Sequence, residues 1–124
     1  MKKFKNKNIF IAIKNAVLGL NYVFLNHRHF KIALIFAILV ILLSYIFNLS
    51  IYEFLLIILA IFFVLFSEII NTLVEEILDI IEPNYNEKIK ILKDISSGAV
   101  FIAVLFSLIV GILIFGSKLF LPIF

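Results

Sequence analysis

The sequence has no cysteine, and it has only four glycines and two prolines among its 124 residues. The absence of cysteine excludes disulfide bonds and thiolate metal sites. The four glycines do not form a glycine-rich phosphate loop, so a bound nucleotide would have to be held by metal and side chains instead.

Apolar residues, by contrast, are in excess. They make up 65% of the chain, and the mean hydropathy is +1.23. A soluble domain of this size has about 45–50% apolar residues. The composition therefore predicts an all-α integral membrane protein with a single domain over residues 1–124. We expect the lysine-rich N-terminus to stay on the mature protein, because polar residues interrupt the following segment and no small-residue cleavage site is evident.

Residues 8–29 are expected to form an amphipathic surface helix. Its apolar face consists of residues at helical spacing: Ile9, Ile13, Ala16, Leu20 and Phe24. Lys2, Lys3 and Lys5 precede it, a pattern typical of a helix lying in an anionic membrane surface. The same face could also pack on the protein's own bundle, and the two interpretations are compatible.

Three membrane spans are expected over about residues 30–49, 52–82 and 95–116, with a short polar connection at 87–94. A helix over 52–82 is roughly 46 Å long, against a hydrocarbon core of about 30 Å, so its last turns must leave the hydrocarbon. Pro83 ends it. Of the eleven lysines and arginines, all but Lys118 fall on one side of this arrangement, which places the N-terminus in the cytoplasm.

A stripe of polar side chains runs along the cytoplasmic end of the second span. At about 100° per residue, Glu68, Asn71, Glu75 and Asp79 fall within about 80° of arc, and Glu76 lies further round the helix. An ionised carboxylate as deep as Glu68 needs a partner in the membrane. One interpretation is a functional site; the other is that the helix simply emerges into water and its charges are solvated.

The Lys93-Asp94 pair at the start of the third span lies on the same side of the membrane as the stripe. Carboxylates suit Mg²⁺ together with substrate phosphates, and a lysine neutralises phosphate oxygens. A deep glutamate beside lipid is placed to accept a proton from a lipid hydroxyl. These parts together are what phosphoryl transfer requires.

Two blocks resemble those of the small bacterial integral-membrane diacylglycerol kinase and undecaprenol kinase family. They read Glu68-x-x-Asn71-Thr72-x-x-Glu75-x-x-x-Asp79 and Lys93-Asp94-x-x-Ser97-Gly98-Ala99-Val100, and the similarity extends to Gly19-Leu20 and Phe30-Lys31. The resemblance implies a homotrimer in the bacterial inner membrane with composite sites between subunits. It also implies transfer of the γ-phosphate of MgATP to the primary hydroxyl of a lipid, with no nucleic-acid partner.

The resemblance also implies roles for individual residues. Glu68 resembles the general base, and Glu75 a metal-binding glutamate. Nucleotide-binding positions are Asn71, Asp79, Lys93 and Asp94, and Ser97 matches a serine that lines the site or packs beside it.

One position departs from the family pattern. The chain reads His27-Arg28-His29-Phe30-Lys31, so His27 stands where a second metal-binding glutamate is expected. Neutral imidazole is a poor Mg²⁺ ligand and a better one for Mn²⁺. His27 could replace the ligand, another carboxylate could substitute, or the metal could be held more weakly.

The Asn71-Thr72 pair and the Ser97-Gly98-Ala99-Val100 run are closer to the undecaprenol branch than to the diacylglycerol branch. We therefore expect undecaprenol as the favoured acceptor. Two rival hypotheses remain: a degenerate family member that binds lipid without turnover, and a non-enzymatic oligomeric membrane protein that uses Glu68 and Asn71 for helix association or ion passage.

Overall fold

The computed structural model describes residues 8–120, and over that range the chain consists of four α-helices without a β-strand. They are α1 (Ile9–Asn26), α2 (Arg28–Ile46), α3 (Ile51–Ile81) and α4 (Glu87–Leu119). The prediction of an all-α protein is therefore confirmed. The three lysines at positions 2, 3 and 5, which precede the expected surface helix, lie outside the described residues.

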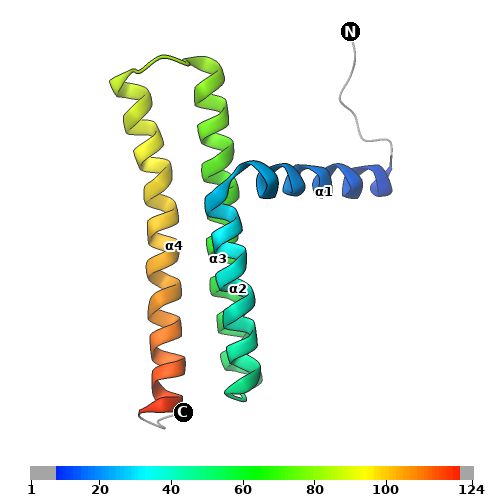
Figure 1. Cartoon of the computed structure of the whole chain (residues 1–124), viewed down its shortest axis with the longest axis vertical. Coiled ribbons are helices and arrows are strands. Elements are labelled where there is room, and N and C mark those ends of the chain that lie inside the picture. Colours follow the sequence, from blue (N-terminus) through cyan, green and yellow to red (C-terminus); the bar gives the residue numbers. More distant parts are fainter. Residues whose placement is uncertain (1–7, 121–124) are drawn as a thin grey trace.

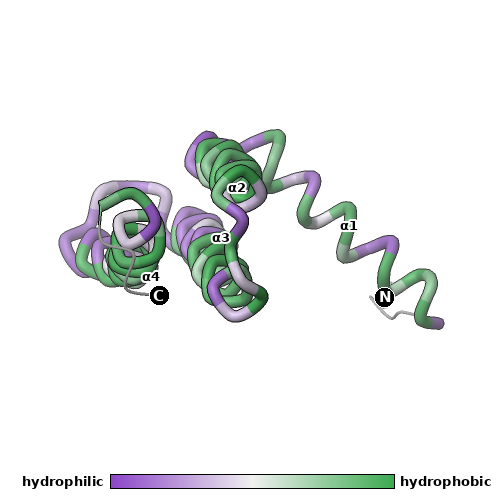
Figure 2. The backbone as a smooth tube through the Cα atoms, turned by 90° about the horizontal axis from the view of Figure 1, so that it is seen from below, coloured by the Kyte–Doolittle hydropathy of each residue, from purple (hydrophilic) through white to green (hydrophobic). Residues whose placement is uncertain are grey.

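Helices α2, α3 and α4 run alongside one another, and α1 runs crosswise to them (Figure 1). Helix α3 is the centre of the arrangement, because it packs most extensively against α4 and next against α2, while α1 packs against α2. Seen from the end, α1 extends away from the other helices (Figure 2). All four helices are long and apolar enough to cross a membrane by length and composition.

The buried core is small. It lies between α3 and α4 and contains Ile57, Ala60, Val110 and Ile114. Many large apolar side chains are exposed instead. Hydrophobic residues predominate along all four helices (Figure 2). This exposure would be unfavourable in water and is expected where lipid or another chain covers the surface. The chain is therefore a multi-pass membrane protein.

Polar side chains cap the helix starts. The Asn8 side chain accepts from the Ile11 backbone at the start of α1, and the Asn86 side chain accepts from the Lys88 and Ile89 backbones at the start of α4. Helix α3 begins with a capping box in which Ser50 and Glu53 each accept from the other's backbone N–H. These contacts satisfy amides that the first turn of a helix leaves without intrahelical partners.

Two of the expected boundaries are wrong. The first helix ends at Asn26 rather than at residue 29, because His27 adopts an extended backbone and α2 begins at Arg28. The expected polar connection at 87–94 is the first part of α4. The Asn86 cap starts the helix there, and an ion pair between Lys90 and Asp94, four residues apart, supports its exposed side.

The far end of the bundle generates a stability prediction. Glu53 completes the capping box, and its Oε1 also lies 3.1 Å from Lys118 Nζ, which joins α3 to α4. Glu53→Ala removes both contacts, so we expect the free energy of unfolding to fall by about 1–2 kcal/mol. Unfolding in mixed detergent micelles, followed by circular dichroism, measures this.

Glu87→Ala is the matched control, because Glu87 is an exposed acid in the first turn of α4 and the cap there is Asn86. Equal losses in the two variants would contradict the assigned role of Glu53.

Candidate active site

The polar stripe lies on the half of α3 that leads to the α3–α4 turn. Glu68, Asn71 and Glu75 are half-buried, and Asp79 is exposed. Asn71 Nδ2 donates to Glu75 Oε1 at 3.3 Å, which confirms that these two residues share one face of the helix. This end of α3 and the start of α4 extend beyond the level of α1 (Figure 1).

Asn71 has an unsatisfied acceptor. Its Oδ1 is buried and has no hydrogen-bond partner in the described part of the chain, while its Nδ2 is bonded to Glu75. A buried polar atom without a partner is unfavourable, and a bound ligand is one way to satisfy it. An amide oxygen beside a carboxylate can coordinate Mg²⁺. The same amide oxygen can instead accept a hydrogen bond from a hydroxyl or amine.

Helix α4 brings a cation to this face. Lys93 Nζ donates to Asp79 Oδ1 at 2.6 Å. This contact joins α4 to the last residue of the stripe along α3. Asp94 does not share this contact, because its Oδ2 accepts from Lys90 Nζ at 2.7 Å. Ser97, one turn further along α4, is exposed. The predicted residues Asp79 and Lys93 are therefore together, and Asp94 lies next to them in sequence with a different partner.

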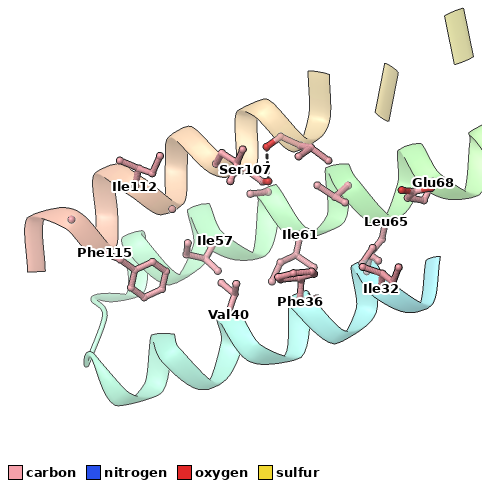
Figure 3. Close-up of a pocket in the computed structure, with 18 of the residues that line it drawn as sticks. Ile32, Phe36, Val40, Ile57, Ile61, Leu65, Glu68, Ser107, Ile112 and Phe115 are labelled. Carbon is pink, nitrogen blue, oxygen red and sulfur yellow. Dashed lines mark hydrogen bonds between the residues drawn. The ribbon is translucent and has the colours of Figure 1, made fainter. Parts of the chain in front are cut away.

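Glu68 lies at a long apolar groove of about 810 Å³. Figure 3 shows the groove with Phe36 of α2 beside Ile61 of α3, and with Glu68 toward one end. Its other end is lined by Phe115, Leu119 and Phe120. His29, at the start of α2, lines the groove together with Glu68. The groove is thus apolar along the bundle and has a carboxylate toward one end.

A second cavity, of about 460 Å³, lies between α3 and α4. Asn71 and Ser96 contribute to its wall among mainly apolar residues. Glu68 and Asn71, although neighbours on the stripe, therefore line different hollows within one chain. The single chain does not bring the expected base and the expected nucleotide-binding residues to one cavity.

His27 contacts Glu76, which is not part of the predicted stripe. Its Nε2 lies 3.1 Å from Glu76 Oε1, and the Tyr22 hydroxyl donates to the same oxygen at 3.3 Å. Glu76 is thus a paired side chain, although it is 42% exposed. No spacing along the chain predicts this contact, because His27 and Glu76 are 49 positions apart and meet only through the bend between α1 and α2.

The described residues contain no group of three or more histidine, aspartate or glutamate side chains close enough to hold a metal ion. Within one chain, the expected metal ligands Glu75 and His27 have different partners, Asn71 and Glu76 respectively. The donor set at Glu75 consists of one carboxylate and one amide oxygen, which fits a cation whose remaining ligands are phosphates and water.

The fold and this face define a multi-pass helical membrane protein that carries acidic and basic groups on the part of α3 and α4 nearest the turn between them. A family model described as prokaryotic diacylglycerol kinase matches residues 14–115. The chain belongs to the prokaryotic diacylglycerol kinase family. A comparison with curated proteins gives no match. Family membership indicates a lipid kinase, with a lipid substrate, a nucleotide and a divalent metal.

Lys93 provides the sharpest test of this site. Its partner Asp79 has a side chain that is 61% exposed, so removing the lysine leaves no buried charge. The resemblance implies that Lys93 contacts the nucleotide phosphates. On that role we expect Lys93→Met to lower phosphate transfer roughly 10²–10³-fold and to leave the helix content unchanged. Steady-state kinetics and circular dichroism measure the two effects.

Lys88→Met is the matched control, since Lys88 is an exposed lysine in the first turn of the same helix. Equal loss of activity in both variants would mean that overall charge, rather than the position of Lys93, matters.

Proposed function

We propose that the protein transfers the γ-phosphate of ATP to the primary hydroxyl of a membrane lipid, with undecaprenol favoured over diacylglycerol. The observation that carries the proposal is the contact between Asn71 and Glu75. It leaves a buried, unpaired amide oxygen on the face where α4 presents Lys93. Such a set of groups is suited to binding phosphates with a metal ion, in a family of lipid kinases.

Glu68 is the proposed general base. It lies near the end of an apolar groove, where a lipid can keep its chain in hydrocarbon and bring its hydroxyl to the carboxylate. Glu68 accepts the hydroxyl proton while the lipid oxygen forms a bond to the γ-phosphorus, and the bond from that phosphorus to the bridging oxygen breaks, with ADP leaving.

Glu75 is the proposed metal ligand, and the Asn71 amide oxygen lies beside it. His27 is proposed as a second ligand. Because it does not meet Glu75 within one chain, it would have to come from another copy in the assembly. A bound Mg²⁺ or Mn²⁺ would neutralise charge on the nucleotide phosphates. Lys93 contacts phosphate oxygens, and Asp79 orients Lys93 through their 2.6 Å contact. Asp94 lies beside Lys93 at the nucleotide.

The crosswise direction of α1 supports a surface location for this helix (Figure 1). A helix that runs crosswise to three membrane spans cannot cross the same bilayer alongside them. Its outward-facing apolar side chains are also exposed, for example Ile9 at 69% and Ile13 at 57%. With ten of the eleven basic residues on that side, we place α1 and the N-terminus at the cytoplasmic face of the bacterial inner membrane.

A homotrimer with sites between subunits is the proposed assembly. Glu68 and Asn71 line different hollows of one chain, which supports a site that a second copy completes. The large exposed apolar surface of α2, α3 and α4 leaves room for contacts between copies. The preference for undecaprenol rests on the Asn71-Thr72 pair and the Ser97-Gly98-Ala99-Val100 run.

A lipid-binding protein without turnover is the second candidate. The observation that favours it is the contact of His27 with Glu76, which occupies one ring nitrogen at the position of the expected metal-binding glutamate. This candidate implies nucleotide binding without a labelled lipid product. Restoring glutamate at position 27 would need a change at Glu76 as well, because two carboxylates would otherwise face each other.

Glu68→Gln tests the assigned base. The change is nearly isosteric and removes the proton acceptor, so we expect transfer to fall roughly 10²–10⁴-fold while assembly is unchanged. Transfer from radiolabelled ATP and size-exclusion chromatography in detergent measure these properties. Normal turnover in Glu68→Gln would exclude the assigned role.

Glu75→Gln tests the assigned metal ligand. We expect the variant to need a higher concentration of Mg²⁺ or Mn²⁺ for half-maximal activity, because a charged oxygen ligand becomes neutral. Mn²⁺ binding to the protein with ATP, followed by electron paramagnetic resonance, gives a readout without turnover. Glu82→Gln, at the end of the same helix, is the control, and an unchanged titration in Glu75→Gln would argue against metal binding there.

A further inference from the structure

The bend between α1 and α2 consists of one residue. The His27 backbone N–H donates to Val23 O and closes α1, and the extended backbone of His27 turns the chain into α2. The His27 side chain makes no capping hydrogen bond at the start of α2. A one-residue link fixes where the two helices meet, but rotation about its backbone torsions changes the direction of α1. Other contacts must fix that direction.

Glu76 of α3 supplies such contacts. Its Oε1 accepts from the Tyr22 hydroxyl in the last turns of α1, at 3.3 Å, and lies 3.1 Å from Nε2 of His27 at the bend. The rings of Tyr22 and His27 are 6.2 Å apart, so both are held on the same side of Glu76. One carboxylate oxygen of α3 therefore contacts both Tyr22 in α1 and His27 at the bend.

The two contacts differ in exposure. The His27 side chain is 21% exposed and that of Glu76 is 42% exposed, so their contact is partly removed from solvent, whereas the contact of Tyr22 with Glu76 is exposed. Hydrogen bonds to a charged group are stronger than neutral ones. On the bend itself, Lys31 Nζ lies 5.5 Å from the centre of the Phe24 ring, but this contact joins α1 to α2 and leaves α3 out.

The contacts of Glu76 with Tyr22 and His27 are close to the proposed catalytic groups. Glu76 follows Glu75 directly on α3, and His29, two residues after the bend, lines the groove at Glu68. The apolar face of α1 is exposed and would lie in the membrane surface, for example Leu20 at 47% and Phe24 at 41%. The angle between α1 and α3 then sets the depth and tilt at which Glu68 meets the lipid hydroxyl.

We propose that Glu76 is a positioning residue: its carboxylate holds α1 and the bend at His27 against α3, and it thereby sets the depth of Glu68 in the membrane. This inference rests on the proposed function for its effect on the reaction. The hold on α1 itself can be measured without turnover.

The first experiment measures the direction of α1. Because the chain has no cysteine, spin labels can be placed at Phe10→Cys on α1 and Ile80→Cys on α3, both exposed positions, without background labelling. Labelled chains are diluted with an excess of unlabelled chains, so that distances between copies do not contribute. Pulsed electron paramagnetic resonance then reports the distribution of distances between the two helices.

We expect a narrow distribution in the otherwise unchanged chain and a broader or displaced one after Glu76→Ala. Glu76→Gln should restore the narrow distribution, because its amide oxygen still accepts from Tyr22 and His27. Tyr22→Phe should give a distribution of intermediate width. Glu87→Ala, which removes an exposed acid, should leave the distribution unchanged. An unchanged distribution in Glu76→Ala would overturn the proposal.

The second experiment separates positioning from general damage. In Glu76→Ala we expect the apparent KM for the lipid to rise roughly three- to tenfold, as a lost hydrogen bond to a charged group allows. The KM for ATP should rise by less, because Glu76 also contacts the proposed metal ligand His27. Glu76→Gln should recover the lipid KM. Equal changes in both KM values, or a displaced α1 with an unchanged lipid KM, would overturn the positioning role. If the unaltered protein transfers no phosphate, the proposed function fails, and the distance measurement still decides whether Glu76 holds α1.

Discussion

The cost of an unpaired charge near the hydrocarbon is the constraint on which this structure depends. Two acidic side chains of α3 are accordingly each joined to a lysine of α4. Glu53 pairs with Lys118 at one end of the bundle, and Asp79 pairs with Lys93 at the other. Each of these pairs connects α3 to α4, the two helices with the most extensive contact. The same requirement therefore satisfies the charges and holds the helix hairpin in register.

Two buried side-chain oxygens have no hydrogen-bond partner among the described residues, Glu53 Oε2 and Asn71 Oδ1, and the second bears on the site. Asn71 uses its amide nitrogen to bind Glu75 and leaves its buried oxygen without a partner. An amide oxygen that is buried and unpaired is a cost to the isolated chain, and a bound ligand would remove that cost. The unsatisfied group and the family membership thus support the same interpretation, a site that takes phosphate and metal at the membrane edge.

Helical periodicity predicts that Asn71 and Glu75 share a face of α3, and the hydrogen bond between them confirms it for this pair. The all-helical fold followed from composition, and the family from two short blocks of residues. The contact of His27 with Glu76 could not be predicted, because it depends on the bend angle between two helices and not on any spacing along the chain. The start of α4 was missed because charged residues there were interpreted as a connection, although the Asn86 cap marks a helix start. The periodicity of α3 predicts that Glu76 lies off the stripe, but it cannot predict the partners Tyr22 and His27, which belong to other parts of the fold.

The most direct test of the central claim is phosphate transfer by the purified protein in detergent micelles, with radiolabelled ATP and Mg²⁺ and then Mn²⁺. Undecaprenol and diacylglycerol are offered side by side. The account predicts a labelled lipid, with more product from undecaprenol. A folded oligomer that labels neither lipid with either metal would contradict it, and the polar face of α3 would then have to serve lipid binding or helix association instead.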